Sequence, residues 1–296
     1  MAQTSGPPST TAAGLDGFRE ETVRAMGDRI HYLVGAKSGA DRAIVLLHGG
    51  IIDAAHVTWR PVLESLAEDA TVVAPHLPGY GPSPLPEAPL NIGRHVESTA
   101  ALLDELDLTD PVVAGLSMGG GIGIGLGLTY PDGVDGLVAL DAMALGDDLA
   151  SGPLTWLLAT VQVTNNLSVE LMRRSRGYVR FGLEQLVADA NPVPEPLVDL
   201  VHAEVKRPGA GAAFRSLRAS EVTWGGYRTN YADRLPDLSV PTRLVHGRDD
   251  HVFPTHWSKR AADRIPDASL TVLEDCGHLP TWERTDDVAD VVRSAL

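Results

Sequence analysis

Short apolar runs alternate with longer amphipathic stretches along most of this sequence. Strand-like runs, rich in β-branched residues, occur at 43–47, 71–75, 112–114, 136–140, 242–246 and 269–273. Stretches with apolar residues at helical spacing lie between them, at 58–69, 92–106, 119–130, 257–265 and 285–295. Strands and helices that alternate in this way favour right-handed crossovers. We therefore expect an α/β fold with a mostly parallel, doubly wound sheet that is covered by helices on both faces.

The beginning of the chain follows a different pattern. Residues 21–26 and 30–34 form two strand-like runs separated by Gly27 and Asp28, residue types that are typical of a β-hairpin turn. We expect these runs to form an antiparallel edge of the sheet. Residues 1–17 are rich in Ser, Thr, Pro and Gly, and we expect a disordered tail there.

The alternation also stops between residues 142 and 234. No clear parallel strand is present in this segment, and amphipathic helical stretches occur at 154–163, 169–178 and 196–205. We interpret 142–234 as a helical cap inserted over the strand ends. Residues 18–141 and 235–296 then form the core.

The composition limits the classes of partner. The chain has 296 residues, of which 44% are hydrophobic and 21% charged, and its formal net charge is -15. The negative charge argues against nucleic acid or an anionic membrane, because binding to either depends on Lys and Arg that neutralise phosphates. A small-molecule partner fits better, and the oligomeric state is left open.

The sequence also carries signals about its compartment. Cys276 is the single cysteine, so no internal disulfide can form, which favours a reducing environment. Residues 1–17 lack the basic and apolar segments of a secretory signal. The long weakly polar stretch at 112–130 is interrupted by glycines and falls short of the roughly 20 apolar residues of a membrane span. We expect a cytoplasmic protein with no membrane partner.

The strongest chemical signal is the Gly-x-Ser-x-Gly pattern of Gly115, Ser117 and Gly119, directly after a strand-like run. Glycines on both sides of a serine permit a sharp strand-to-helix turn that exposes the hydroxyl. The N–H group of Met118 would then lie at the start of the following helix, directed at an oxyanion. The sequence thus predicts Ser117 as a nucleophile with an oxyanion donor beside it.

A serine nucleophile needs a base, and an imidazole base needs an acceptor that fixes its tautomer. Both follow later strand-like runs: Asp249 and Asp250 come after 242–246, and His278 comes after 269–273. We therefore expect His278 to act as general base and then acid, and Asp250 to orient it. The adjacent Asp249 is the alternative acid.

These motifs together resemble those of the α/β-hydrolase superfamily, over about residues 21–296. They comprise His48-Gly49-Gly50, Leu77-Pro78-Gly79-Tyr80-Gly81, Gly115-Leu116-Ser117-Met118-Gly119, Gly247-x-x-Asp250-x-x-x-Pro254 and Cys276-Gly277-His278. The resemblance implies that Gly50 supplies the second oxyanion N–H group, that the insertion is the cap domain, and that the acid is Asp250 rather than Asp249.

Other candidate residues receive structural interpretations. We expect His48 to shape the loop that holds Gly50, and carboxylates such as Asp110 and Asp141 to cap helices or face solvent. The glycine-rich run 119–127 fits no dinucleotide-binding pattern and indicates close helix packing. No metal site or other cofactor is expected, because the remaining histidines lack a ligand motif; these include His76, His246, His251 and His256. Aromatic residues of the cap are candidates for lining a substrate pocket, namely Trp156, Trp224 and Tyr227.

A serine at the elbow indicates acyl chemistry, whereas epoxide hydrolases and haloalkane dehalogenases use a carboxylate nucleophile. We expect a carboxylic ester hydrolase that forms an acyl-enzyme. The chain is also similar to meta-cleavage-product hydrolases, which break carbon–carbon bonds, but it has Leu116 and Leu279 where those enzymes usually carry Asn and Trp. A carbon–carbon hydrolase is therefore the second hypothesis. A ligand-binding protein with little turnover is the third.

Overall fold

The protein is described here by a computed structural model that covers residues 11–36, 40–147 and 162–296. Within these residues, an eight-stranded sheet has the strand order β1-β2-β4-β3-β5-β6-β9-β10. The strands are β1 (Phe18–Ala25), β2 (Asp28–Gly35), β3 (Ala43–Leu47), β4 (Thr71–Pro75), β5 (Val112–Leu116), β6 (Gly136–Leu140), β9 (Thr242–Gly247) and β10 (Ala268–Leu273). β2 pairs antiparallel with β1 and β4, and every other neighbouring pair is parallel. The predicted parallel sheet and antiparallel edge are confirmed.

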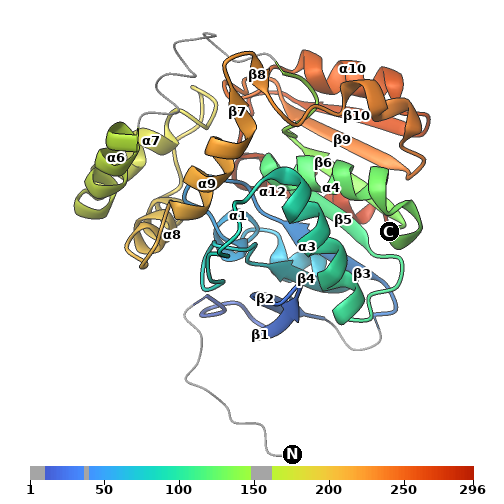
Figure 1. The fold of residues 1–296 in the computed structure, drawn as a ribbon, viewed down its shortest axis with the longest axis horizontal. Coiled ribbons are helices and arrows are strands. Elements are labelled where there is room, and N and C mark those ends of the chain that lie inside the picture. Colours follow the sequence, from blue (N-terminus) through green and yellow to red (C-terminus); the bar gives the residue numbers. More distant parts are fainter. Residues whose placement is uncertain (1–10, 37–39, 148–161) are drawn as a thin grey trace, which may run out of the picture.

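Alternate residues of each central strand face opposite sides of the sheet. In β3, Ile44 and Leu46 belong to one buried cluster, whereas Val45 and Leu47 belong to another. The first cluster is covered by α1 (Ala55–Thr58), α2 (Leu63–Leu66) and α12 (Thr285–Arg293). The second is covered by α3 (Ile92–Glu105), α4 (Met118–Thr129) and α10 (His256–Arg264). Helices therefore cover both faces, as Figure 1 shows, and the apolar runs are explained by burial on both sides.

The helix expected at 58–69 is wrong in its extent. The chain instead forms two short helices, α1 and α2, on either side of Pro61. Proline lacks the backbone N–H group that an α-helix needs, and its ring disfavours a helical conformation in the residue before it. Pro61 thus explains why the helical spacing of apolar residues does not produce one continuous helix.

The segment between β6 and β9 contains α6 (Gln162–Arg174), α7 (Arg176–Leu183), α8 (Glu195–Val205) and α9 (Ala212–Glu221), followed by a small hairpin, β7 (Val222–Thr223) and β8 (Gly226–Tyr227). The expected helix 196–205 is confirmed by α8. The stretch 169–178 is divided between α6 and α7, because the Ser175 side chain accepts the N–H of Tyr178 and starts a new helix. Most of the expected helix 154–163 lies outside the described residues.

The segment before β1 is ordered over residues 11–17. The Leu15 side chain is buried in the same cluster as Trp59. The N–H of Asp16 donates to Glu64 at 2.7 Å, and Arg60 donates to the carbonyl of Ala13 at 2.9 Å. The disordered tail expected at 1–17 is therefore wrong for residues 11–17, because an apolar anchor and polar contacts hold them against α2. Residues 1–10 lie outside the described part.

Among the described helices, none combines the length and the apolar character needed to cross a membrane.

Candidate active site

Ser117 lies between the end of β5 and the start of α4. Its backbone has φ 55° and ψ -113°, a conformation that is costly for a residue with a side chain. The Ser117 N–H donates to the carbonyl of Leu140 at 2.8 Å, and its carbonyl accepts the N–H of Met143 at 3.0 Å. The neighbouring strand end therefore holds the strained turn in place, and the turn has the form expected of a nucleophile elbow.

The glycines that flank Ser117 are required by backbone contacts. A Cβ atom on Gly115 would lie 2.2 Å from the carbonyl of Gly119, and a Cβ on Gly119 would lie 2.2 Å from the carbonyl oxygen of Leu47. Further along α4, a Cβ on Gly125 would lie 2.5 Å from the hydroxyl of Tyr231. The interpretation of the glycine-rich run as close helix packing is confirmed.

Asp250 and His278 are in direct contact. The Nδ1–H of His278 donates to Asp250 Oδ2 at 2.9 Å, and both side chains are almost fully buried. Asp250 Oδ1 accepts the N–H groups of Val252 at 2.7 Å and Phe253 at 3.3 Å. The acid on the imidazole is therefore Asp250, whereas the structure gives no contact between Asp249 and His278.

The ionisation of Asp250 is governed by these neighbours. Burial opposes the charged form, but the nearby His278 and hydrogen bonds from His246 and His278 outweigh it and hold the pKa of Asp250 well below its usual range. Asp250 is thus a carboxylate at neutral pH. A carboxylate on Nδ1 leaves Nε2 of His278 free of the proton and able to accept one.

Glu283, whose role the sequence analysis did not identify, holds the loop that carries His278. Its carboxylate accepts the N–H groups of Gly277 at 3.0 Å and Leu279 at 3.3 Å, the residues on either side of His278. It also accepts the N–H of Ala188 at 2.8 Å. The N–H of His278 donates to the carbonyl of Leu186 at 2.6 Å. The segment after α7 and the loop after β10 are therefore fastened together.

The residues expected to supply oxyanion donors come from two loops beside Ser117. Met118 is the first residue of α4, where backbone N–H groups have no partner within the helix. Gly50 follows β3, and a Cβ on it would lie 3.1 Å from the ring of Phe214 in α9. Both residues line the same cavity as Ser117 and His278. Their role as oxyanion donors to a ligand at Ser117 stays a prediction.

His48 has the structural role that the sequence predicts. Its Nδ1 donates to the carbonyl of Gly49 at 2.7 Å, and its Nε2 accepts the N–H of Leu77 at 3.0 Å. Full burial lowers the pKa of His48 to about 3, so the ring is neutral and can both donate and accept. The loop that contains Gly50 is thereby linked to the loop after β4.

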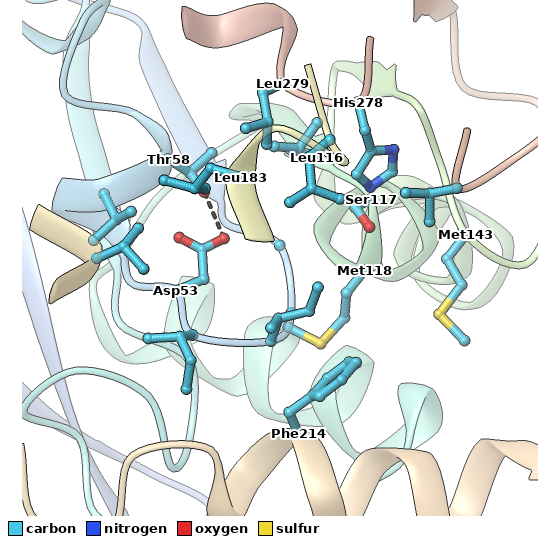
Figure 2. Close-up of a pocket in the computed structure, with 18 of the residues that line it drawn as sticks. Asp53, Thr58, Leu116, Ser117, Met118, Met143, Leu183, Phe214, His278 and Leu279 are labelled. Atoms are coloured by element: carbon cyan, nitrogen blue, oxygen red, sulfur yellow. Dashed lines mark hydrogen bonds between the residues drawn. The ribbon is translucent and has the colours of Figure 1, made fainter. Parts of the chain in front are cut away.

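A cavity of about 390 Å³ opens onto Ser117. Figure 2 shows the His278 ring beside the Ser117 hydroxyl, with Asp53 on another wall and Phe214 on the opposite side from His278. Most lining residues are apolar, including Ile52, Met143, Leu183, Val201, Phe214 and Leu279. Of the aromatic candidates, Tyr227 lines the cavity, Trp224 is 65% exposed and is not in the lining, and Trp156 lies outside the described residues.

The acidic and basic side chains of the lining are Asp53, Arg218, Glu221 and His278. Glu221 accepts the N–H groups of Ile92 at 2.8 Å and Thr229 at 3.0 Å. Asp53 accepts the hydroxyl of Thr58 at 2.6 Å, drawn as a dashed line in Figure 2. Burial raises the pKa of Asp53 to about 6 despite its hydrogen bonds. The mostly apolar lining therefore contains a few polar side chains, and Asp53 and Glu221 are held by hydrogen bonds to neighbouring residues.

The expectation that the other carboxylates cap helices or face solvent is wrong for Asp141, which is fully buried. Ligand atoms of Asp141, Asp250 and His278 lie within 4.8 Å of one another, a spacing that a metal ion can bridge. However, Asp141 Oδ1 accepts the backbone N–H of Gly247 at 2.8 Å, and Asp250 Oδ2 accepts the ring Nδ1–H of His278. These two oxygen atoms are occupied by protein donors, so the group has the character of a hydrogen-bond network.

Comparisons with known proteins identify the family. A model described as the alpha/beta hydrolase family matches residues 44–291. The chain is 30% identical over 262 residues to a 2-hydroxymuconate semialdehyde hydrolase from Pseudomonas sp. (strain CF600), covering 88% of each chain. It is 31% identical over 261 residues to a pimeloyl-[acyl-carrier protein] methyl ester esterase from Aromatoleum aromaticum, covering 84% of this chain and 98% of that one.

Solved structures with a similar fold are also found. A meta-cleavage product hydrolase from Pseudomonas fluorescens IP01 superposes with a TM-score of 0.78 at 24% identity, over 93% of this chain and 96% of that chain. With its elbow serine, its histidine and a family model that spans most of its length, the chain belongs to the alpha/beta hydrolase family.

Proposed function

We propose that this protein is a serine hydrolase that cleaves a small carboxylic ester, with Ser117 as nucleophile, His278 as general base and acid, and Asp250 as the residue that orients His278. The observation that carries the proposal is the 2.9 Å hydrogen bond between His278 Nδ1 and Asp250 Oδ2, beside a serine on a strained elbow. Activation of a serine hydroxyl requires an imidazole beside it whose other nitrogen is held by a carboxylate.

The reaction follows from these parts. His278 Nε2 takes the proton of Ser117 as the hydroxyl oxygen attacks the ester carbonyl. The N–H groups of Gly50 and Met118 stabilise the oxyanion that forms. Protonated His278 then gives its proton to the leaving alcohol, and the acyl-enzyme remains on Ser117. Water activated by His278 releases the acid, so the cycle needs no cofactor.

The lining of the cavity supports an ester with apolar substituents. Leu183, Val201 and Phe214 come from α7, α8 and α9 and contribute apolar walls. We assign residues 142–234 as a cap on this basis. A cavity of about 390 Å³ lies within the range of pockets that hold small molecules.

A carbon–carbon hydrolase of the meta-cleavage-product type is the second candidate, because several relatives carry such names. One of them is named for 2-hydroxy-6-oxo-2,4-heptadienoate, an anion. In the described part of this chain, Arg218 is the cationic side chain of the cavity lining, His278 is assigned as the base, and Asp53 and Glu221 are acidic. This balance of charge favours a neutral ester over an anionic dienoate.

Labelling with a fluorophosphonate probe and hydrolysis of 4-nitrophenyl esters of increasing chain length test the proposal. We expect wild type to be labelled and to hydrolyse short esters, and Ser117→Ala to lose both activities. Ser294→Ala, which changes an exposed serine, is the matched control and should behave like wild type. Turnover of vinylogous 1,5-diketones without ester hydrolysis would favour the second candidate. Neither labelling nor turnover would favour a ligand-binding protein.

A further inference from the structure

A buried pair of side chains lies behind the proposed triad. His246, in β9, and Asp141, directly after β6, are 1% and 0% exposed. The Nε2 atom of His246 lies 3.4 Å from Asp250 Oδ2 and 3.6 Å from Asp141 Oδ1. Asp250 Oδ2 therefore faces His278 on one side and His246 on the other.

The contacts of His246 indicate where its proton lies. Nε2 is 3.1 Å from the carbonyl oxygen of Phe253, which can only accept a hydrogen bond, so Nε2 carries a proton. The other nitrogen, Nδ1, is 2.7 Å from the hydroxyl of Ser258, which can accept or donate. The ring can therefore hold a second proton without losing a partner, and its Nε2–H lies between two carboxyl groups.

Asp141 has a strained backbone conformation. Its φ is 43°, a left-handed conformation that residues other than glycine rarely adopt. Its Oδ1 accepts the N–H of Gly247 at 2.8 Å, but its buried Oδ2 has no hydrogen-bond partner among the described residues. Strain and an unpaired buried oxygen together are typical of functional positions rather than of packing alone.

The charges around His246 and Asp141 also support a functional role for this pair. Burial opposes protonation of His246, but Asp250 and Asp141 outweigh it and raise the pKa of His246. Burial raises the pKa of Asp141 as well. Among the described residues, the titratable groups near this pair are Asp250 from the loop after β9 and His278 and Cys276 from the loop after β10. Glu283 also acts on Asp141 by its charge.

We propose that His246 is a positioning residue of the hydrolase, which, backed by Asp141, fixes the carboxylate of Asp250 and sets the pH range in which the triad works. The inference rests on the proposed function. A positive charge on His246 stabilises the carboxylate of Asp250 and repels a second positive charge on His278. Without that charge, protonation of His278 becomes easier and the base is lost at a higher pH.

A purely structural role would leave a different signature. Asp141 joins the ends of β6 and β9 through its bond to Gly247, and Asn at this position keeps the accepting oxygen. Asp141→Asn therefore preserves the strand contact and removes the ionisable carboxyl group. A change of the pH profile in Asp141→Asn cannot come from loss of that contact.

The first experiment measures kcat/KM against pH for wild type, His246→Gln and Asp141→Asn. We expect the acidic limb to move to higher pH by about 0.5 to 1 unit in His246→Gln, as charges several ångströms apart in a buried site predict. In Asp141→Asn we expect a smaller displacement of the limb, because the loss of a nearby negative charge and the weaker charge on His246 act on His278 in opposite directions. His251→Gln, the same substitution at an exposed position, should reproduce the wild-type profile. Coincident acidic limbs in wild type and both variants would overturn the inference.

A second readout does not depend on turnover. NMR of histidine-labelled protein follows the Nδ1 proton that His278 shares with Asp250, and we expect its resonance to shift in both variants but not in Ser294→Ala. An unchanged resonance in both variants would overturn the inference even if activity fell. Absence of labelling and turnover in wild type would instead refute the proposed function, while this resonance would still test the network. If His246→Gln does not fold, the pH profile and the NMR resonance are measured on Asp141→Asn alone.

Discussion

Glu283 brackets His278: its carboxylate accepts the backbone N–H groups of the residues immediately before and after the histidine. The same carboxylate reaches Ala188 and the side-chain amide of Asn191. Glu283 thus fixes the loop that contains His278, the proposed base, against the segment that follows α7. The position of His278 is set by main-chain contacts on both sides rather than by its own side chain alone.

Replacing Glu283 by Ala should lower kcat by about 10- to 100-fold, because a base displaced by about 1 Å loses its alignment with the nucleophile. Glu283→Gln should retain more activity, since its carbonyl oxygen still accepts one N–H group. Steady-state kinetics on a 4-nitrophenyl ester checks both values. Glu184→Ala, at an exposed position, is the control. Equal activity of Glu283→Ala and the control would contradict this role.

Asp250→Asn should lower kcat by about 10⁴-fold, because an amide cannot hold the imidazole in the required tautomer or stabilise its protonated form. Asp249→Asn should stay within about 2-fold of wild type, since Asp250 rather than Asp249 contacts His278. Kinetics of the two neighbouring variants decide which residue is the acid. The reverse ranking would assign the role to Asp249.

Two glycines of α4 should respond in opposite directions to alanine. Gly119→Ala should destabilise the protein by about 3 kcal/mol or more, because its Cβ would lie 2.2 Å from the Leu47 carbonyl oxygen. Gly123→Ala should stabilise it by up to about 1 kcal/mol, because the nearest atom is 3.8 Å away and alanine favours helices. Urea unfolding of both variants measures the difference. Similar stabilities would show that close packing does not explain these glycines.

Asp53 should make stability depend on pH. Its pKa rises from 3.8 to about 6 on folding, so the folded state binds the proton more tightly than the unfolded state. Stability therefore falls as pH rises from about 4 to about 6 and then stays level, by about 3 kcal/mol for this group. In urea unfolding, Asp53→Asn should gain stability relative to wild type over that interval. A difference between the two proteins that does not vary with pH would argue against the buried carboxyl.

The sequence was most informative where a strand ends in a recognisable motif. Ser117 and His278 follow strands of a parallel sheet, whose carboxyl ends meet at one edge, so local patterns predict that they meet. The buried network was not predictable in this way. Asp141 contacts Gly247 across more than 100 residues, and although Gly247 belongs to a motif, nothing in the sequence around Asp141 marks it as the partner. The sequence analysis also did not identify Glu283. Its partners are mostly backbone N–H groups, which almost every residue type has, so the sequence does not show which residues they belong to.

Some misassignments had local causes instead. Pro61 interrupts the helical pattern of 58–69. Its effect on the backbone is local, but it cannot be seen from the spacing of apolar residues alone.

The burial of Leu15 has a tertiary cause. Leu15 is a single apolar residue in a polar stretch, so its burial depends on a surface formed by α1 and α2. Tertiary contact decided the order of that segment.

The separation between the strand-end loops and the helical walls of the cavity has an evolutionary consequence. Ser117, Asp250 and His278 lie directly after β5 and in the loops after β9 and β10, whereas Leu183, Val201 and Phe214 belong to α7, α8 and α9. Substrate preference can therefore diverge through mutations in the helices while the proposed catalytic residues are inherited intact. Redesign of selectivity in this scaffold should begin with those three side chains.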